Sequence, residues 1–460
     1  MPASYDTLVI GSGEGGKFLA WHLARSGQRV AVVERRWIGG SCPNTNCLPS
    51  KNEIFSAEVA HLARQAGAFG VATGPVAVDM RGVVARKRAM VRDLIEMHLE
   101  QYRASGAALI MGTARFTGPK AVAVALNEGG ALDVTADRIV LNLGTSPAIP
   151  GTPGLRDAAP LTNIEALELD VLPEHLVVLG GGYVGLELAQ AYRRFGARVT
   201  VVERGPRIAG REDADVADAL ARLLAAEGID LLTSTEVASV RGRSGEAVEV
   251  AVRSGAGTAV IAGSHILVAA GRTPNTGGIG LDLAGVALTE RGTIAVNDRL
   301  ETSAPGVWAI GECAGSPAFT HVSADDFRVI RDNLAGGSRS TRGRLVPYCL
   351  FTDPPLARVG LSETDARAGG LDVRVATLPM RAVLRTRTTG RSEGFMKAVV
   401  GPDDRILGFA MIGAEAGEVM AAVHVAMLAG LPAAALRDAV LAHPTMAEGL
   451  NGLFAAVPAA

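Results

Sequence analysis

Residues 8–16 read LVIGSGEGG, an apolar run that ends in a cluster of glycines. A second apolar run, RVAVVER, follows at residues 29–35 and carries the acidic residue Glu34 near its end. An apolar strand, a glycine-rich turn, a helix and a second strand that ends in an acid form one βαβ unit of a dinucleotide-binding fold. The pattern therefore predicts an α/β architecture that starts at the beginning of the chain.

The same pattern occurs a second time. Residues 177–185 read VVLGGGYVG, and residues 198–204 read RVTVVER, with Glu203 in the place of Glu34. The offset between the copies is constant, since 180 − 11 and 203 − 34 both equal 169. Two copies of one unit, related without an insertion, predict two Rossmann-like nucleotide-binding domains in one chain.

Each glycine of such a turn has its own task. The first permits a tight turn, the second lets the backbone approach a pyrophosphate, and the third packs the helix on the strand. The helix N-terminus then faces the phosphates, and Glu34 and Glu203 are expected to accept hydrogen bonds from ribose hydroxyls. The glycines are Gly11, Gly13 and Gly16 in the first copy and Gly180, Gly182 and Gly185 in the second.

Glu203 also bears on the choice of nicotinamide nucleotide. A carboxylate at this position repels the 2′-phosphate of NADP and suits the free hydroxyl of NAD. Arg204, Arg207 and Arg211 follow closely and offer charge that can hold a phosphate. The sequence favours NAD(H) over NADPH.

Cys42 and Cys47 follow the first copy within the segment GGSCPNTNCLPSK. Residues five apart on a straight helix have Cα atoms about 8.7 Å apart, whereas a disulfide tolerates at most roughly 7 Å. The pair can therefore bond only in a distorted first turn, which Pro43, Asn44 and Asn46 tolerate. Only four cysteines occur in 460 residues, so a disulfide framework is excluded. We interpret the pair as an exchangeable redox disulfide.

The position of the cysteines assigns the two nucleotide sites. They come directly after the first copy, so the redox-active ring of its cofactor can lie over them. Reduction of a disulfide by a hydride donor requires a flavin between the nicotinamide and the thiols. The first site is therefore expected to bind FAD and the second NAD(H).

The remaining chain is expected to alternate between helical and strand-rich segments. Helices are predicted over residues 52–105, Asp213–Gly228 and Ala416–Ala429, and strands over residues 113–143, 236–270, 357–360, 395–400 and 406–412. The character changes at about residue 341, where a third domain of the α+β class is predicted.

Composition narrows the range of partners. The chain has 48% hydrophobic residues and a formal net charge of −2, which argues against nucleic acid or an anionic membrane as the main partner. Residues 1–4 lead straight into the first apolar run, so no signal peptide is expected, and no apolar stretch is long enough to span a bilayer. A cytoplasmic protein is predicted, in a compartment where thiols stay reduced.

With these residues in view, the chain resembles the FAD-dependent pyridine nucleotide-disulfide oxidoreductases along almost its whole length. This family includes dihydrolipoamide dehydrogenase, glutathione reductase, mercuric reductase and the reactive-chlorine resistance reductase. Beyond the cysteine segment, the likeness rests on NLGT at residues 142–145, AGRTPN at 270–275, TSAPGVWAIGE at 302–312, FTDP at 351–354 and HPTMAE at 443–448.

The resemblance implies roles for the redox residues. Cys47 would face the flavin in a charge-transfer contact, and Cys42 would be the interchange thiol that attacks the substrate. Lys51, four residues after Cys47, would place a positive charge near the flavin nitrogen that accepts hydride, with Glu187 as its ion-pair partner. Tyr183 resembles the aromatic gate over the nicotinamide pocket.

The resemblance also implies an acid–base dyad of His443 and Glu448, in which the glutamate fixes the tautomer of the histidine. A histidine suits proton transfer near neutral pH. In the family the dyad serves the cysteines of the other subunit, so a homodimer with shared active sites is expected. Further binding residues implied are Gly144, Thr145, Gly311 and Glu312 for FAD and Gly271 for NAD; no resident metal is expected.

The implied domains are a FAD-binding domain of residues 1–148 and 273–340, an NAD(P)-binding domain of residues 149–272 and a dimerisation domain of residues 341–460. Three residues depart from the family pattern. Glu312 stands where the family has an aspartate on the FAD ribitol, and Asn46 replaces a glycine and is expected to tolerate a left-handed backbone. Glu14 lies inside the phosphate loop, so its side chain is expected to point away from the pyrophosphate.

The predicted function is hydride transfer from NADH through FAD to the Cys42–Cys47 disulfide and on to a small-molecule or metal-ion oxidant, as in the mercuric and reactive-chlorine reductase branch. The tail ends VPAA, without the cysteine pair of mercuric reductases, so efficient mercury reduction is not expected. Two alternatives remain open. One is dihydrolipoamide dehydrogenase, and the other is a redox-responsive flavoprotein that regulates a partner.

Overall fold

The structure is a computed structural model that describes residues 2–459. The chain divides into two compact units, each described here by itself. The first unit contains the residues up to Glu53, Arg81–Ala148 and Gly271–Arg344. The second contains Ile54–Met80, Ile149–Ala270 and the residues from Leu345 onward.

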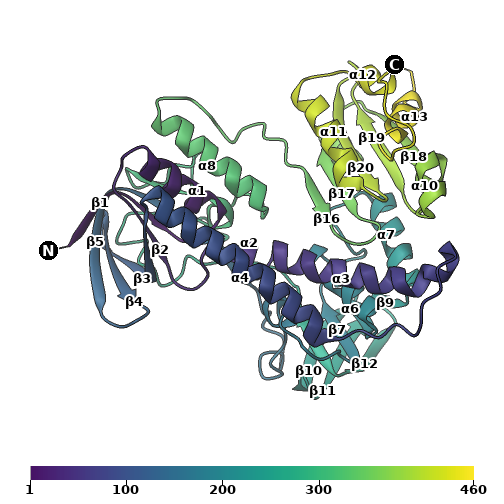
Figure 1. The fold of residues 1–460 in the computed structure, drawn as a ribbon, viewed down its shortest axis with the longest axis horizontal. Coiled ribbons are helices and arrows are strands. Elements are labelled where there is room, and N and C mark those ends of the chain that lie inside the picture. The colour runs from purple at the N-terminus through teal and green to yellow at the C-terminus, as the bar shows by residue number, and fades with distance from the viewer. Residues whose placement is uncertain (1, 460) are drawn as a thin grey trace. The chain divides into compact units, whose positions relative to one another are not determined.

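A six-stranded sheet forms the centre of the first unit (Figure 1). β1, β2, β3, β5 and β15 pair in parallel. β4 lies antiparallel between the second half of β3 and the first half of β5. The strands are β1 (Ala3–Ile10), β2 (Val30–Glu34), β3 (Ala108–Gly118), β4 (Ala121–Leu126), β5 (Ala131–Leu141) and β15 (Val307–Ala309). β2 and the last four residues of β1 are buried, as expected for strands of a parallel sheet that is covered on both faces.

Helices cover this sheet. α1 (Glu14–Arg25) packs against α8 (Thr320–Leu334), and its Leu19 and Ala20 are buried in one cluster with Val9. The remaining elements of the unit are α2 (Ser41–Asn44), α4 (Met80–Ser105), β6 (Thr145–Pro147), β14 (Arg272–Pro274) and η2 (Gly311–Ala314). α3 (Cys47–Gln65) begins in the first unit, and its residues from Ile54 belong to the second.

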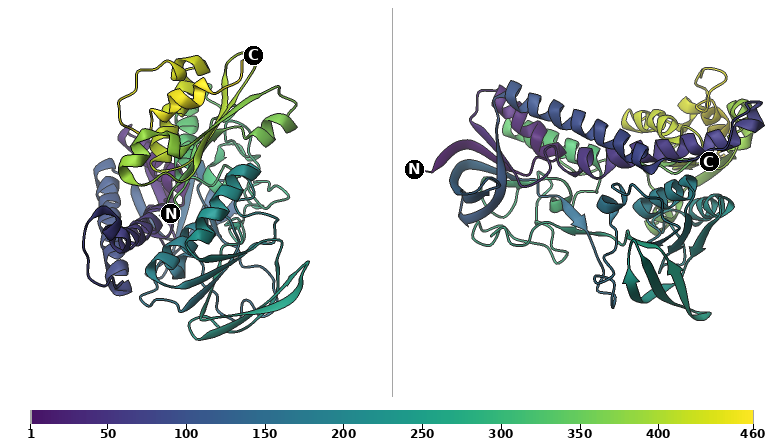
Figure 2. Two further views of the ribbon diagram at one scale, coloured as in Figure 1. Left: turned by 90° about the vertical axis from the view of Figure 1, so that its right-hand side faces the viewer. Right: turned by 60° about the horizontal axis from the view of Figure 1, so that its bottom comes forward.

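A four-stranded parallel sheet of the second unit repeats the order of the first. Its order is β13-β7-β8-β9, which corresponds to β5-β1-β2-β3 of the first sheet. Its strands are β7 (His175–Leu179), β8 (Arg198–Val202), β9 (Ile229–Leu232) and β13 (His265–Val268), with the helices α5 (Asn163–Ala166), α6 (Tyr183–Phe195) and α7 (Ala214–Ala226). A separate antiparallel sheet consists of β10 (Glu236–Arg243), β11 (Ala247–Ser254) and β12 (Gly257–Gly263) (Figure 2).

The C-terminal part of the second unit is an antiparallel sheet of order β16-β17-β20-β19-β18. Phe409 and Met411 of its central strand are buried in the core. Its strands are β16 (Tyr348–Leu350), β17 (Leu356–Gly360), β18 (Arg374–Pro379), β19 (Phe395–Val400) and β20 (Ile406–Ile412). The helices of this part are α9 (Glu363–Ala368), α10 (Leu384–Thr389), α11 (Ala416–Leu428), α12 (Ala433–Arg437) and α13 (Gly449–Ala455). Two short 3-10 helices, η1 (Ala66–Phe69) and η3 (Met380–Ala382), complete the unit.

The predicted α/β architecture with a C-terminal α+β part is confirmed. One predicted helical segment is divided: residues 52–105 form the end of α3 and all of α4, and residues 70–79 between them form no helix. Gly70 ends the first part with a φ of 75°, a conformation that favours glycine. Within residues 2–459, no helix combines the length and the apolar character needed to cross a bilayer.

Candidate active site

The first glycine loop connects β1 to α1. Gly11 has a φ of +100°, and a Cβ atom there would lie 2.3 Å from the backbone oxygen of Asn142. A Cβ atom on Gly13 would lie 2.7 Å from the Asn142 amide nitrogen. Gly13 is the N-cap of α1 and gives the helix no side-chain cap. The loop therefore brings bare backbone to a helix N-terminus, an arrangement that fits a pyrophosphate.

Glu14 is the charged residue inside this loop, and its charge is compensated within the chain. Its carboxylate lies 2.7 Å from Lys17 Nζ. Lys17 is buried and also lies 2.7 Å from His98 Nε2, while His98 Nδ1 contacts the Leu94 carbonyl. The ion pair with Lys17 removes the conflict between a carboxylate at this position and a bound phosphate.

The second glycine loop connects β7 to α6 and repeats the geometry of the first. Gly180 has a φ of +111°, and a Cβ atom there would lie 2.6 Å from the Ala269 carbonyl oxygen. A Cβ atom on Gly185 would lie 2.1 Å from the Gly180 oxygen. Gly182 caps α6, again without a side-chain hydrogen bond. The second loop thus fits a second pyrophosphate.

Glu34 and Glu203 make corresponding hydrogen bonds to the backbone of their glycine loops. Glu34 accepts hydrogen bonds from the N–H groups of Ser12 and Arg36 at 3.0 and 2.8 Å. Glu203 accepts from those of Gly181 and Gly205 at 2.7 and 2.6 Å. The donors are again 169 residues apart, since 181 − 12 and 205 − 36 both equal 169. The repeat therefore extends to individual hydrogen bonds.

The two acids differ in how many further donors they meet. Glu34 also accepts from the Ser12 hydroxyl at 2.7 Å and from the Trp37 N–H at 3.0 Å. Glu34 is buried, whereas Glu203 is half-buried. A carboxylate has about four lone-pair positions, and four donors already contact Glu34, so the hydrogen bond predicted from a ribose hydroxyl has to replace one of them.

The two cysteines lie at a break between two helices. α2 ends at Asn44 and α3 begins at Cys47, and the side chain of Asn44 donates to the Gly40 carbonyl at 2.7 Å. The predicted distortion is confirmed, but its explanation through Asn46 is wrong. Among the described residues, the positive φ angles of this segment belong to Gly39 and Gly40. A Cβ atom on Gly40 would lie 2.6 Å from the Gly13 Cα atom, so only glycine fits against the first glycine loop.

The side chains of Cys42 and Cys47 face each other at hydrogen-bond distance. This hydrogen bond, followed by burial and the charge of Cys47, raises the pKa of the Cys42 thiol. Cys47 Sγ lies 3.2 Å from the Thr320 hydroxyl, at the first residue of α8. The hydroxyl and the helix N-terminus both stabilise a thiolate. Thr320 also contacts Cys42 and lowers its pKa, but this contact only partly offsets the rise. When the reduced pair keeps one proton, that proton therefore resides on Cys42.

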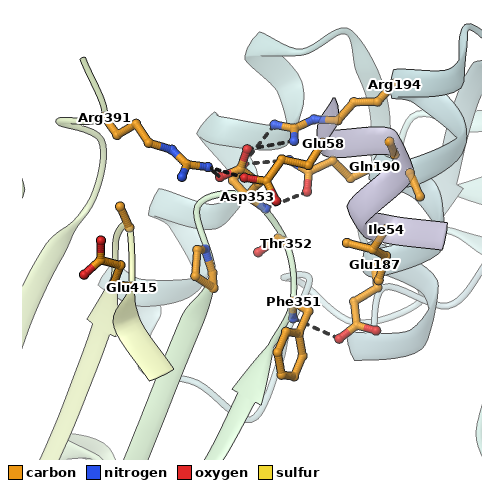
Figure 3. A pocket seen from close by; sticks show the side chains of 14 residues that line it. Ile54, Glu58, Glu187, Gln190, Arg194, Phe351, Thr352, Asp353, Arg391 and Glu415 are labelled. Carbon is orange, nitrogen blue, oxygen red and sulfur yellow. Dashed lines mark hydrogen bonds and ion pairs between the residues drawn. The ribbon is translucent and has the colours of Figure 1, made fainter. Parts of the chain in front are cut away.

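Lys51 and Glu187 belong to different units. Lys51 lies on α3, four residues after Cys47, and is half-buried. Glu187 is buried on α6 and accepts the Phe351 N–H at 2.9 Å. It lines a cavity of about 230 Å³ in the second unit, which Asp353 also lines (Figure 3). The ion pair between Lys51 and Glu187 stays a prediction.

The other residues predicted to contact FAD gather around one ion pair. Glu312 accepts from Arg272 Nε at 3.1 Å and from the Thr145 hydroxyl. Gly144 and Gly311 have φ angles of 64° and 69°. Gly271, which precedes Arg272, has a φ of +121°. It was predicted to bind NAD but lies in the first unit, whereas the other residues predicted to bind NAD lie in the second. The contact of Glu312 with the ribitol stays a prediction.

His443 and Glu448 form the predicted pair. His443 Nδ1 lies 2.9 Å from Glu448 Oε2, and the Thr445 N–H approaches the same oxygen at 3.4 Å. The histidine side chain is 66% exposed, whereas that of the glutamate is 17% exposed. A carboxylate on Nδ1 fixes the tautomer and directs Nε2 outward, as a proton-transferring histidine requires.

Comparison with known proteins identifies the family. Residues 5–326 match the pyridine nucleotide-disulphide oxidoreductase model, and residues 346–453 match the dimerisation domain of the same group. The chain belongs to the pyridine nucleotide-disulphide oxidoreductases. It therefore carries the dimerisation domain of this family.

Three relatives of this oxidoreductase cover nearly its whole length. RclA of Escherichia coli, described as a probable pyridine nucleotide-disulfide oxidoreductase, is 37% identical, with 98% of this chain and 99% of RclA covered. A mercuric reductase of Streptomyces lividans is 35% identical, with coverages of 97% and 95%. A dihydrolipoyl dehydrogenase of Thermus scotoductus is 36% identical, with coverages of 97% and 96%. A solved Cu(II) complex of RclA superposes with a TM-score of 0.89 over 98% of this chain and 99% of that one, at 35% identity.

The oxidoreductase is a flavoprotein that uses FAD and a pyridine nucleotide. The residues present fit both groups, because each glycine loop leaves a helix N-terminus without a side-chain cap and has no room for a Cβ atom at its first glycine. The roles assigned to the individual residues of the two loops stay predictions.

Thr320 is a site residue that sequence reasoning missed. It lies 273 positions from Cys47 and outside every motif that carried the resemblance. No helix was predicted over α8, and a single threonine outside the motifs carries no signal that marks it as a thiol partner.

Proposed function

We propose that this protein is an NADH-dependent flavoprotein disulfide reductase whose Cys42–Cys47 pair reduces a small oxidant or a metal ion. The observation that carries the proposal is the hydrogen-bonded cysteine pair at the break between α2 and α3, with Thr320 beside Cys47. Such a pair alternates between disulfide and dithiol without refolding of a helix. Supporting it, the similar E. coli protein is described as an HOCl-induced flavoprotein disulfide reductase in complex with Cu(II).

The proposed cycle balances two electrons. FAD, when bound, supplies the two-electron carrier between nicotinamide and thiols. The Cys42–Cys47 disulfide takes up two electrons and one proton and becomes a thiol–thiolate pair, with the proton on Cys42. The pair then gives two electrons to the oxidant and releases that proton, and the disulfide forms again. Soft thiolate ligands suit a metal ion such as copper or mercury at the same place.

The chain's own residues divide the work. Cys47 holds the negative charge on the flavin side, and Cys42 attacks the substrate once its proton is removed. His443, oriented by Glu448, removes and returns that proton. We propose that it serves the cysteines of the partner subunit, so that the homodimer shares its active sites. We also propose the domain bounds given above: residues 1–148 and 273–340 bind FAD, residues 149–272 bind NAD(P), and residues 341–460 form the dimerisation domain. A cytoplasmic location is a further part of the proposal.

Dihydrolipoamide dehydrogenase is the second candidate. A dihydrolipoyl dehydrogenase is 36% identical, and the observed contact between His443 and Glu448 suits that reaction equally well. In that case electrons flow from a dithiol to NAD. A redox-responsive protein that regulates a partner remains the alternative from another class.

An NADH-coupled assay of the purified holoenzyme decides among these candidates. The panel is lipoamide, oxidised glutathione, mercuric and cupric ions and quinones, each tested with NADH and NADPH. We expect NADH to be preferred and a metal ion or small oxidant to be the best acceptor. Rapid oxidation of dihydrolipoamide would favour the second candidate, and a clear preference for NADPH would contradict the role of Glu203.

Cys42→Ser tests the thiol step separately. The variant should reduce its flavin with NADH at the normal rate and lose turnover of the oxidant. Unchanged turnover in Cys42→Ser would contradict the proposal.

A further inference from the structure

Tyr183 is the first residue of α6 and stands directly after the glycine cap of the second loop. Its phenol donates a hydrogen bond to the carboxylate of Glu212, and the hydroxyl of Tyr348 donates to the same oxygen at 2.7 Å. The two aromatic rings are stacked, with centroids 5.7 Å apart and an interplanar angle of 30°. Two phenols therefore meet on one carboxylate oxygen.

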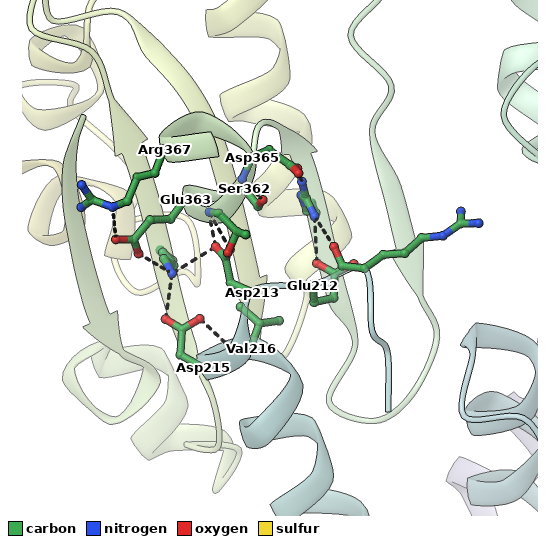
Figure 4. Close-up of polar contacts among 12 residues, drawn as sticks. Glu212, Asp213, Asp215, Val216, Ser362, Glu363, Asp365 and Arg367 are labelled. Atoms are coloured by element: carbon green, nitrogen blue, oxygen red, sulfur yellow. Dashed lines mark hydrogen bonds and ion pairs between the residues drawn. The ribbon is translucent and has the colours of Figure 1, made fainter. Parts of the chain in front are cut away.

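The second oxygen of Glu212 faces a cation. Arg358 Nη1 lies 3.4 Å from it and also donates to the Arg211 carbonyl at 3.0 Å. Asp365 binds the other end of the same guanidinium at 2.8 Å, and Figure 4 shows Glu212 and Asp365 turned toward it from two sides. The Glu212 side chain is only 1% exposed. A carboxylate this deeply buried is held in one place, because each partner lost leaves a buried charge unpaired.

Both tyrosines remain hydrogen-bond donors over the whole working pH range. Burial, followed by the negative charge of Glu212, raises the pKa of Tyr183. The same two causes, in the same order, raise the pKa of Tyr348. Neither phenol loses its proton, so the two hydrogen bonds persist wherever the protein is folded.

The cluster joins two parts of the second unit. Tyr183 and Glu212 lie in the part that carries the second glycine loop, whereas Tyr348 belongs to β16 and Arg358 to β17. The residues from 346 to 453 match the dimerisation domain. The aromatic residue at the nucleotide loop is thus tied to the sheet of a different domain.

We propose that Glu212 and Tyr348 form a latch that holds Tyr183 at the nucleotide loop and thereby sets the affinity for NADH. The inference rests on the proposed function and on the role that the family resemblance implies for Tyr183, that of a gate over the nicotinamide pocket. Glu212 and Tyr348 are positioning residues, because they act through Tyr183. The ring has to give up its hydrogen bond and its stacking partner to move aside, so the latch opposes entry of the nicotinamide.

Tyr348→Phe in the FAD-loaded enzyme tests the latch. The substitution removes one hydrogen bond and keeps the stacked ring and the ion pair between Glu212 and Arg358. We expect the KM for NADH to fall at least about threefold, because the Glu212 carboxylate loses the donor that fixes it in place and can then follow Tyr183 when the ring moves aside. The rate at which the chemically reduced enzyme passes electrons to its oxidant should not change. Tyr5→Phe, on β1 of the first unit, is the matched control and should leave both quantities unchanged.

The alternatives give different results. If Tyr183→Ala lowers the KM for NADH but Tyr348→Phe leaves it constant or raises it, the latch is overturned. The role of Tyr183 as a gate then remains. A KM that is also constant in Tyr183→Ala overturns the gate and the latch together. The proposed thiol chemistry is contradicted if the wild-type enzyme is reduced normally by NADH but passes no electrons to any oxidant. In that case the latch still stands, provided that Tyr348→Phe lowers the KM for NADH.

Discussion

Cys42 and Cys47 have different environments although they lie five residues apart. The hydrogen bond to Cys47 and burial raise the pKa of Cys42, so this thiol is protonated at neutral pH and becomes a thiolate only as the pH rises. The Thr320 hydroxyl lies 3.2 Å from Cys47 Sγ and also contacts Cys42, where it only partly offsets the raised pKa. One thiol therefore needs a base, and the other is stabilised as an anion by its neighbours.

His443→Gln should make the need for a base measurable. At pH 7 the rate of oxidant reduction is expected to fall at least about 100-fold, as is typical when a general base is lost. The rate should recover as the pH rises, because hydroxide then ionises Cys42 directly. The measurement is the pH profile of the oxidative half-reaction, with His22→Gln on α1 as control. A profile of normal shape in His443→Gln would refute the role of the dyad.

Thr320→Val tests the stabilisation of Cys47. The substitution keeps the shape of the side chain and removes the hydroxyl, so the pKa of the Cys47 thiol is expected to rise by about one unit. Rates of alkylation of the reduced enzyme, measured against pH, report this pKa. Thr289→Val on the surface is the control. Identical profiles for the wild type and Thr320→Val would show that the hydroxyl contributes nothing.

At the scale of the elements, the two glycine loops are similar enough to be tested in parallel. A Cβ atom at Gly11 or Gly180 collides with backbone oxygen in each case, at 2.3 and 2.6 Å. Gly11→Ala is expected to yield protein without FAD, whereas Gly180→Ala should retain FAD and fail to be reduced by NADH. Flavin absorbance after purification and anaerobic titration with NADH measure the two properties.

The control for this pair is Gly27→Ala. Gly27 also has a positive φ, +89°, but nothing lies within 4 Å of the added Cβ atom. The backbone strain of about 1–2 kcal/mol is then present without the collision. This variant should keep both properties. If Gly11→Ala and Gly180→Ala exchanged their phenotypes, the assignment of the two sites would be wrong.

A buried ion cluster connects α7 to the C-terminal sheet. Lys397 of β19 lies within 3.1 Å of Asp213, Asp215 and Glu363 (Figure 4). Burial opposes the charge on Asp213, but hydrogen bonds from Thr364, Glu363 and Lys397 outweigh it and lower the pKa of Asp213 to about 2. The charged form of this carboxylate therefore stabilises the fold.

Asp213→Asn should lower the melting temperature by about 2–5 °C at pH 7. Because the pKa is depressed, the stabilisation is complete above the usual value of 3.8 and is lost as the pH falls from there toward 2. The gap to the wild type should be constant between pH 7 and pH 5 and narrow below pH 4. Thermal unfolding at several pH values measures it. Glu236→Gln, which removes an exposed ion pair, should have no comparable effect.

Sequence patterns predicted a strand well where its residues and the turns beside it carry the signal themselves. The turns at Gly118–Pro119 and Gly129–Gly130 separate β3, β4 and β5. The bounds expected for β19 and β20 match the structure. β16 and β18 were not predicted, because β16 is only three residues long and β18 shows no strict alternation of apolar and polar residues.

At the scale of the whole molecule, the distance along the chain between two contacting residues decides whether their contact could be predicted from the sequence. The glycine loops and the cysteine pair are each contained in about ten residues, and the motifs identified them. The contacts of Cys47 with Thr320 and of Glu212 with Tyr348 span 273 and 136 residues. No local pattern encodes such contacts, because they arise only when the strands and helices have packed.

The shared active site of the proposed dimer predicts complementation. Cys42→Ser and His443→Gln should each be inactive toward the oxidant. When the two variants are co-expressed with different tags, the purified heterodimer has one site with both intact groups and should recover about half of the wild-type activity. The two purified homodimers are the controls. A heterodimer as inactive as they are would mean that both groups act within one chain.

Gly40 rests against Gly13 with no room for a side chain between them. Gly13 belongs to the first glycine loop, and Gly40 stands two residues before Cys42. If FAD binds this loop as proposed, we expect loss or distortion of the nucleotide to reach Cys42 through the backbone, without an intervening side chain to absorb it. Thiol-labelling reagents can accordingly serve as a sensor of cofactor loading, and damaged or incompletely assembled molecules will reveal themselves by an altered cysteine reactivity.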